Sequence, residues 1–251
     1  MRPANWIPAF AGMTKSVNLL LFSEDDRVGA DRIRLTDHRL QHLHEVLGSS
    51  EGDSLRVGEI NGRMGAAELV KLAPEEALLD VRLDTPPPPK LPLALVLALP
   101  RPKMLRRILR TVAELGVESL YLINSYRVEK SYWQTPVLDP AVMEDYFLEG
   151  LSQARDTVLP TVSLHKRFKP FVEDELPALM SGRRCLLAHP GDYPPCPRVT
   201  GEPALLAIGP EGGFIPYEVE KLQEAGCETV SLGPRILRVE NAVAALVARF
   251  S

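Results

Sequence analysis

The stretch AIGPEGGFIPYEVEKLQEAGCETVSLGPRILRVENAVAALVA, residues 207–248, decides the fold and contains one local plan twice. In each copy an apolar run (204–208, then 229–232) breaks into a Gly-Pro loop (209–213, then 233–235), and a helix is expected next, at Pro216 and near Val239. Loops that follow strands and precede helices are the usual ligand sites of open α/β sheets. Glycine permits close backbone approach and proline stiffens a turn, so we expect these loops to bind a ligand mainly through main-chain groups.

Two such loops, in this order and spacing and closed by an apolar helix, resemble the paired signature of the RsmE family. Its members are SPOUT-superfamily methyltransferases that modify a uridine N3 in 16S ribosomal RNA. The segments that carry the resemblance are IGPEGGF (208–214), SLGPRILRVE (231–240), LALPRPKMLRRILRTVAELGV (97–117) and NSYRVEKSYW (124–133). The similarity covers nearly everything after residue 17. It implies S-adenosylmethionine as cofactor, a homodimer formed through the knot region, and an α/β trefoil-knot domain preceded by a small PUA-like β-barrel domain.

Composition places the chain among ordinary globular proteins, with 251 residues, 45% hydrophobic and 25% charged. No apolar run approaches the length of a membrane span, and the N-terminus lacks a signal-peptide layout. The three cysteines are odd in number and widely spread. They favour a reducing cytoplasm over a disulfide framework.

The net charge of −4 argues against indiscriminate nucleic-acid binding but leaves room for a local basic face. Such a face is indicated by Arg101, Lys103, Arg106, Arg107 and Arg110, which fall within ten residues that include no acid. A solvated helix face is the ordinary reading of a charge run. An RNA-binding surface is the alternative, because this helix begins beside the predicted Gly-Pro loops.

Four segments are expected along the chain. Residues 1–16 have no helical or strand periodicity and are interpreted as a disordered leader. We further hypothesise that this leader is not native, and that translation starts at a GUG codon that corresponds to Val17. Residues 17–85 form the PUA-like RNA-binding domain, residues 86–90 a polyproline linker, and residues 91–251 the SPOUT methyltransferase domain.

The first domain reads as short strands with turn signals between them. Strands are expected at 19–22, 32–35, 54–57, 64–70 and 77–83, with a hairpin at Asn61-Gly62 and one helix over 37–47. His38, His42 and His44 lie on or near this helix, but no cysteine or paired acid completes a metal site.

Beyond the linker, strand and helix alternate, which predicts a mainly parallel sheet. Strands are expected at 93–99, 119–123, 161–164 and 185–188, besides the two runs that precede the Gly-Pro loops. Helices are expected from Pro102 to before Gly116, over 139–155 and 170–180, and from the two starts already given. In the last helix Val239, Ala242, Val243, Leu246, Val247 and Phe250 form one wide apolar face that must be buried against the sheet or a partner subunit.

The sequence lacks the motifs that other common enzyme classes and binding sites require. There is no Gly-x-Ser-x-Gly, no phosphate-binding loop and no His-Glu-x-x-His. The first strand–helix turn is Ala98-Leu99-Pro100-Arg101-Pro102, which disfavours dinucleotide binding. Cys185, His189 and Cys196 lack a fourth metal ligand, so no metal is expected.

The resemblance assigns the donor to three segments bound largely by main chain. The cofactor-binding residues are Ala188, His189, Pro190, Ile208, Gly209, Pro210, Gly212, Gly213, Leu232, Gly233, Ile236 and Leu237. The RNA-binding residues are Arg101, Lys103, Arg106, Arg127, Lys130, Trp133 and Arg155, with Tyr126 and Gln153 in the same family segments. Tyr126 and Trp133 could stack on a base or belong to the core.

Methyl transfer to N3 requires loss of its proton, and cations near O2 or O4 stabilise the anion that develops. Arg238 and Arg235 are the predicted catalytic cations, with a structural salt bridge from Arg238 to Glu240 or Glu211 as the alternative. Glu211 could accept the N3 proton, although orienting a backbone group or an arginine is favoured. Asn241 stands where many members have threonine, which retains a helix cap but alters geometry.

The expected function is therefore N3-methylation of the uridine conventionally numbered 1498 in 16S ribosomal RNA of the small subunit. Two alternatives remain open. One is a SPOUT methyltransferase that acts on transfer RNA or another ribosomal position. The other is a non-catalytic RNA-binding or ribosome-assembly protein.

Overall fold

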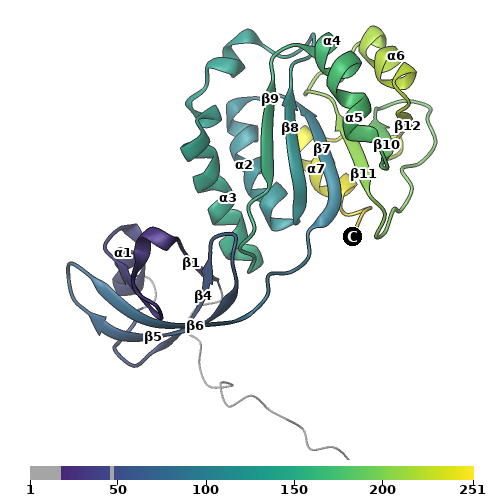
Figure 1. Ribbon diagram of the computed structural model, residues 1–251. Coiled ribbons are helices and arrows are strands. Elements are labelled where there is room, and N and C mark those ends of the chain that lie inside the picture. The colour runs from purple at the N-terminus through teal and green to yellow at the C-terminus, as the bar shows by residue number, and fades with distance from the viewer. Residues whose placement is uncertain (1–17, 46–47) are drawn as a thin grey trace, which may run out of the picture. The chain divides into compact units, whose positions relative to one another are not determined.

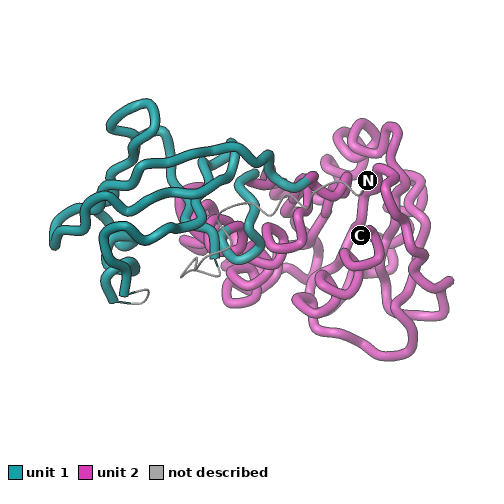
Figure 2. Tube along the Cα trace, turned by 90° about the horizontal axis from the view of Figure 1, so that it is seen from below, with its two compact units in different colours: residues 1–88, 152–158 teal, residues 89–151, 159–251 magenta. Residues whose placement is uncertain are grey.

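A computed structural model describes residues 18–45 and 48–251 (Figure 1), so the expected leader lies outside the described residues. The chain divides into two compact units (Figure 2). The first comprises residues up to 88 together with 152–158, and the second comprises 89–151 and 159–251. The sequence places the segment 152–158 in the second domain. Its hydrogen bonds join it to the first unit, since Ser152 O accepts from Leu19 N (2.9 Å) and Thr157 O from Asn61 N (2.8 Å).

The first unit is built on a mixed six-stranded sheet in the order β1-β4-β5-β6-β3-β2. Its strands are β1 (Leu20–Phe22), β2 (Arg27–Gly29), β3 (Arg32–Leu35), β4 (Ser54–Glu59), β5 (Met64–Leu72) and β6 (Ala77–Thr85). Strands β1 and β4 are parallel and the other pairs are antiparallel. The predicted hairpin is confirmed: β4 pairs with β5, and Asn61 in the turn has φ of 60°.

Alternation along the strands builds the core of this unit. In β3, Ile33 and Leu35 are buried while Arg32 and Arg34 are exposed, the pattern of a sheet with one solvated face. The helix α1 (His38–Glu45) covers the buried face with Leu40 and Leu43. The expected helix is therefore confirmed over 38–45, and its last two residues, 46–47, lie outside the described residues. A 3-10 turn (Glu24–Asp26) and the strand β2 were not predicted.

The second unit is built on a six-stranded sheet, all parallel, in the order β12-β10-β11-β7-β8-β9. Its strands are β7 (Leu91–Ala98), β8 (Val117–Ile123), β9 (Thr161–His165), β10 (Arg184–Ala188), β11 (Ala204–Ile208) and β12 (Glu228–Val230). Every residue of β11 is buried, as expected of a central strand covered on both faces. The prediction of a parallel α/β sheet is confirmed.

Helices cover both faces of this sheet (Figure 1). The main ones are α2 (Pro102–Glu114), α3 (Pro140–Ala154), α6 (Pro216–Glu224) and α7 (Val239–Val247), and α7 packs against α2. The single helix expected over 170–180 is wrong in detail: it is broken into α4 (Phe168–Pro170), a π-helical turn (Phe171–Glu175) and α5 (Leu176–Met180). Pro170 and Pro177 lack the N–H that a regular helix needs, which accounts for the interruption. Two 3-10 turns, 130–134 and 136–138, precede α3. No helix in the described part of the chain is both long and apolar enough for a membrane span.

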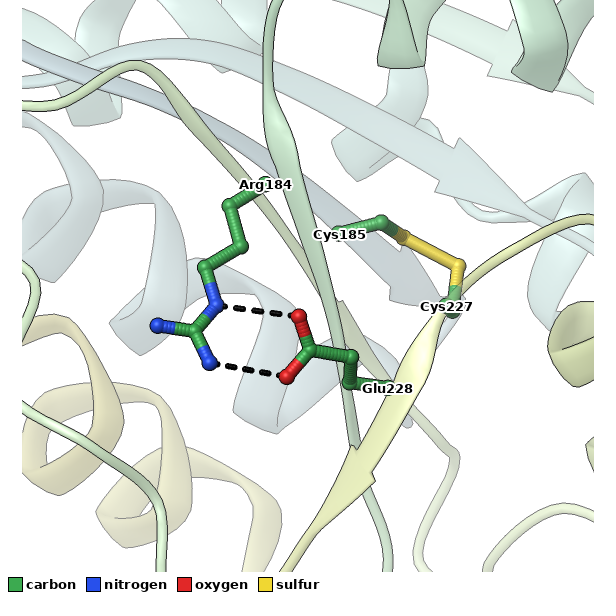
Figure 3. Close-up of a disulfide and its surroundings, with 4 residues drawn as sticks. All are labelled: Arg184, Cys185, Cys227 and Glu228. Atoms are coloured by element: carbon green, nitrogen blue, oxygen red, sulfur yellow. Dashed lines mark hydrogen bonds and ion pairs between the residues drawn. A yellow bond between two sulfur atoms is a disulfide. The ribbon is translucent and has the colours of Figure 1, made fainter.

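The expectation that the cysteines are free is wrong for two of the three. Cys185 and Cys227 form a disulfide, with their Cα atoms 4.6 Å apart (Figure 3). They are 42 residues apart in sequence, but β10 and β12 are neighbours in the sheet, so the fold brings them together. Beside the disulfide, Arg184 donates to both carboxylate oxygens of Glu228, at 3.1 and 2.7 Å.

Candidate functional site

A pocket lies beyond the carboxyl ends of β10, β11 and β12, and its empty volume, including the part open to solvent, is about 680 Å³. This edge of a parallel sheet is where α/β folds place ligands. The pocket is lined by Ala188, His189, Pro190, Ile208, Gly209, Pro210, Glu211, Gly213, Ser231, Leu232, Gly233, Arg235, Ile236, Leu237, Val239, Ala242 and Leu246.

The structure brings together all the residues predicted to bind a cofactor except Gly212, and adds Glu211 and Arg235 from the predicted catalytic group. Four lining residues were not predicted as site residues. Ser231 precedes the second Gly-Pro loop, while Val239, Ala242 and Leu246 come from α7. The α7 residues belong to the apolar face that the sequence predicts, and their helical spacing is the signal that marks them. That spacing predicts burial but does not distinguish a pocket wall from packing against the sheet or a partner.

Two glycine-containing turns form part of the pocket wall. Gly213 and Gly233 have φ of 72° and 103°, conformations that disfavour a side chain. The first loop is closed by the bond from Gly213 N to Pro210 O (2.7 Å), and the second by the bond from Gly233 N to Ser231 Oγ (2.9 Å). Two turns closed in this way present backbone groups to a ligand.

Gly212 lies on the outer side of the first loop. Its carbonyl accepts a hydrogen bond from Arg127 Nη1, and a Cβ at this position would come within 2.8 Å of Arg127 Cδ. The glycine therefore permits the arginine to lie against the loop. In this structure Gly212 contacts the segment predicted to face RNA instead of lining the pocket.

Glu211 is engaged in a structural contact. Its Oε1 accepts a hydrogen bond from Arg101 N (3.0 Å) and lies 3.9 Å from Arg101 Nε. Arg101 immediately precedes α2, so the carboxylate sits at the positive end of a helix dipole. This geometry supports the orienting role of Glu211 over the role of a proton acceptor.

Arg235 and Arg238 are both exposed, on the loop between β12 and α7. Among the residues that the structure describes, no ion pair holds either guanidinium, and the salt bridge considered for Arg238 to Glu240 or Glu211 is not formed. Arg235 lines the pocket, whereas Arg238 is the residue before α7. Both guanidinium groups are therefore available to an anionic group that approaches the pocket.

The residues predicted to bind RNA fall on separate elements. Arg101, Lys103 and Arg106 are exposed at the start of α2, and Arg127 and Lys130 are exposed after β8. Trp133 is half-buried, and its Nε1 donates to Asn124 Oδ1 (2.9 Å), which favours a structural role for the ring. Arg155 has φ of 56° and belongs to the segment grouped with the first unit. Of the other basic residues on α2, Arg110 pairs with Glu149 and stacks on Tyr146 at 4.6 Å.

Two titratable groups near the pocket are shifted by their surroundings. Burial, aided by the charge of Arg127, lowers the pKa of His189, so its imidazole is neutral at pH 7. Burial raises the pKa of the Cys196 thiol, which keeps it protonated. Within residues 18–45 and 48–251 no group of three or more His, Cys, Asp or Glu side chains is arranged to hold a metal ion.

Comparison with known proteins agrees with this architecture. A family model described as RNA methyltransferase domain matches residues 87–251. Ribosomal RNA small subunit methyltransferase E of Treponema pallidum is 31% identical over 243 residues, which cover 92% of this chain and 90% of the relative. The protein of the same name from Synechocystis is 28% identical over 230 residues, covering 87% and 72%.

A solved structure shares the fold. Ribosomal RNA small subunit methyltransferase E from Neisseria gonorrhoeae, crystallised with S-adenosyl methionine, superposes with a TM-score of 0.73 over 92% of this chain and 96% of that chain, at 20% identity. At this identity the likeness bears on the fold alone. The family model and the Treponema relative together extend over both units, and the chain therefore belongs to the ribosomal RNA small subunit methyltransferase E family of RNA methyltransferases.

Proposed function

We propose that this protein transfers the methyl group of S-adenosylmethionine to N3 of uridine 1498 in 16S ribosomal RNA. The observation that carries the proposal is the pocket, in which two Gly-Pro loops and one face of α7 converge. Two arginines are exposed there, Arg235 in the second loop and Arg238 just after it. Family membership supports RNA as the methyl acceptor and the small-subunit RNA as its class.

The pocket fits the donor in its chemistry. S-adenosylmethionine combines a flat adenine, a ribose and a charged methionyl tail, and it supplies an electrophilic methyl group. Ile208, Leu237 and Leu246 would hold the apolar part of the donor, and the main chain of the two loops would offer hydrogen bonds to its polar groups. His189 is neutral near pH 7, so it adds no positive charge beside a cationic sulfonium.

The acceptor nitrogen of uridine is protonated at neutral pH, so it becomes nucleophilic only as negative charge develops on the base. Arg235 and Arg238 are the residues that stabilise this charge, because both are exposed at the loop and no ion pair in the described structure occupies them. Holding donor and base in line supplies most of the remaining acceleration. Glu211 orients Arg101 in this scheme, and the N3 proton is released to solvent water.

Several finer features belong to the proposal. The first unit serves as the PUA-like RNA-binding domain at residues 17–85, residues 86–90 as the linker, and residues 91–251 as a SPOUT domain with a trefoil knot. The active form is a homodimer in the cytoplasm, and the substrate is the assembled small subunit, since a local basic surface on an acidic protein suits recognition by shape.

The pocket is tested by filling it. Ala242 lines the pocket from α7, so Ala242→Leu adds bulk without changing a backbone φ. Ala141→Leu makes the same change at an exposed position of α3 and is the matched control. Titration calorimetry with S-adenosylmethionine should give a Kd raised at least about tenfold by Ala242→Leu and unchanged by Ala141→Leu. Equal affinity for S-adenosylmethionine in the wild type and both variants would refute the assignment of this pocket as the donor site.

The reaction is tested on small subunits that carry unmodified 16S RNA. Nuclease digestion and mass spectrometry should locate the new methyl group on N3 of the proposed uridine. Arg238→Ala should lower kcat about a hundredfold with little change in donor Kd, as expected for loss of one charge-stabilising group. A methyl group at another ribosomal position or on transfer RNA would support the first alternative function, and donor binding without transfer to any RNA would support an assembly role.

A further inference from the structure

Glu218 is a buried carboxylate with no role in the proposed reaction. It lies in the first turn of α6, and only 2% of its surface is exposed. Its Oε2 accepts a hydrogen bond from Ile215 N (3.0 Å), at the end of the first Gly-Pro loop. Its Oε1 accepts one from Tyr126 N (2.7 Å), which is 92 residues away in sequence. One side chain therefore joins two loops through their main chains.

The two loops face different parts of the site. Gly209, Pro210, Glu211 and Gly213 line the pocket, and Ile215 ends the loop that contains them. Tyr126 follows β8, is 79% exposed, and precedes Arg127. A second link lies beside the first, because Arg127 Nη1 donates to the carbonyl oxygen of Gly212. Both links connect the pocket loop to the 125–128 segment.

We propose that Glu218 is a positioning residue that couples occupancy of the donor pocket to RNA binding by the 125–128 segment. The inference rests on the proposed function, because it takes the pocket ligand to be the methyl donor and the macromolecule to be RNA. A donor that orders the Gly-Pro loop also fixes Ile215, and through Glu218 it fixes the backbone of Tyr126 and Arg127. RNA then binds a segment that is already ordered, so its binding no longer includes the entropy cost of ordering that segment. The donor therefore increases the affinity for RNA, which is positive cooperativity.

The charge and the two oxygens of Glu218 are both required. A carboxylate has only acceptors, so it can serve two N–H groups at once, and its charge is favourable at the N-terminus of α6. Glutamine in the same place has one acceptor oxygen and one NH₂ group. Its NH₂ would face an amide N–H, so one of the two loops would lose its anchor. The matched control is Glu220→Gln, an exposed glutamate on the same helix.

The test measures the Kd of unmethylated small subunits with and without saturating S-adenosylhomocysteine, which is the donor without its methyl group. In the wild-type protein and in Glu220→Gln, the occupied pocket should tighten RNA binding at least about fivefold. In Glu218→Gln this ratio should fall below about twofold. Equal ratios in the wild type and Glu218→Gln would overturn the proposal, and so would a wild-type ratio of one.

A second variant covers the case in which Glu218→Gln does not fold, judged by circular dichroism and Tm. Arg127→Met removes the parallel link from an exposed position and should also reduce the ratio, whatever it does to RNA affinity alone. A ratio that Arg127→Met leaves at the wild-type value would overturn the coupling through this pair of loops.

Amide hydrogen exchange separates failure of this inference from failure of the proposed function, because it requires neither donor nor RNA. Exchange at Tyr126 and Ile215 should be about tenfold or more faster in Glu218→Gln than in Glu220→Gln, with β8 amides unchanged. Unchanged exchange would refute the anchoring role of Glu218. Faster exchange in a protein that binds neither S-adenosylmethionine nor S-adenosylhomocysteine would retain the anchor and refute the proposed function.

Discussion

The disulfide between Cys185 and Cys227 should raise the stability of the second unit by an amount that follows from its loop. It closes 42 residues of chain, and the chain-entropy relation for a loop of this length gives about 4 kcal/mol. For a unit of this size, that free energy corresponds to a difference in Tm of about 8–16 °C between the oxidised and reduced protein. The same closure holds β10 beside β12, and Ala188 at the end of β10 and Ser231 just after β12 both line the pocket.

Thermal unfolding with and without a reducing agent measures this difference, provided that thiols are counted first. The chain has three cysteines, so the denatured oxidised protein should show one reactive thiol and the reduced protein three. Cys196 is buried, and it should react slowly until the protein unfolds. Cys196→Ser is the control, because it removes the free thiol and leaves the disulfide and the length of its loop unchanged, so it should retain the difference in Tm.

Two results would contradict this prediction. Three reactive thiols in denatured protein that had never been reduced would show that the disulfide is not formed. A single thiol with equal Tm in the oxidised and reduced proteins would retain the disulfide but refute its contribution through loop closure. In a reducing cytoplasm the two cysteines would be free thiols. The difference in Tm between the oxidised and reduced proteins is therefore also the stability that the protein lacks there.

Three further perturbations test particular contacts. Glu211→Gln keeps one acceptor for Arg101 N, so kcat should stay within about threefold of wild type, whereas loss of a general base would cost 10²-fold or more. The pKa of His189 is lowered from its usual value of about 6.5, so the imidazole becomes protonated only at pH below that value. The protonated imidazole would repel the cationic sulfonium of S-adenosylmethionine, so the Kd of the donor should rise at low pH. Calorimetry across pH should show this rise in the wild type and not in His189→Asn. In the first unit, hydrogen bonding to Arg39 lowers the pKa of Asp37. Burial of Asp26 favours its neutral form, but hydrogen bonds from Arg39 and the Ser23 backbone outweigh burial and lower the pKa of that carboxyl too. This stability is present above the unfolded pKa of about 3.8 and is lost as pH falls through the folded values, so Tm should drop below about pH 4 in wild type and much less steeply in Arg39→Met.

The pocket was foreseeable because its elements carry strong local signals. Each Gly-Pro loop follows an apolar run and precedes a helix, and parallel strands end at one edge of their sheet, so loops far apart in sequence meet there. That reasoning needs no strand order. The residues it could not assign are those of α7, such as Ala242, whose apolar spacing is equally consistent with packing against the sheet or a partner.

Other features depend on the strand order, which periodicity does not contain. Cys227 meets Cys185 only because β12 lies beside β10, and the intervening strand β11 pairs on the other side of β10. The short strand β2 has no alternation to reveal it, since Val28 and Gly29 are both exposed. Pro177 is the sequence signal for the break in the helix expected over 170–180, because a proline inside a helix lacks the N–H that the helix needs.

The strand order also explains the different contacts of two glutamates, Glu211 in the first Gly-Pro loop and Glu218 in the helix that follows it. Strand β11 is followed in the sheet by β7 and then β8, so the loop after β11 lies near the ends of both. Glu211 joins it to the end of β7 through Arg101, and Glu218 joins it to the end of β8 through Tyr126. The first contact is at the surface and competes with water, whereas the second is buried and has no substitute partner. Loss of Glu218 should therefore disturb the loop far more than loss of Glu211, although only Glu211 lines the pocket.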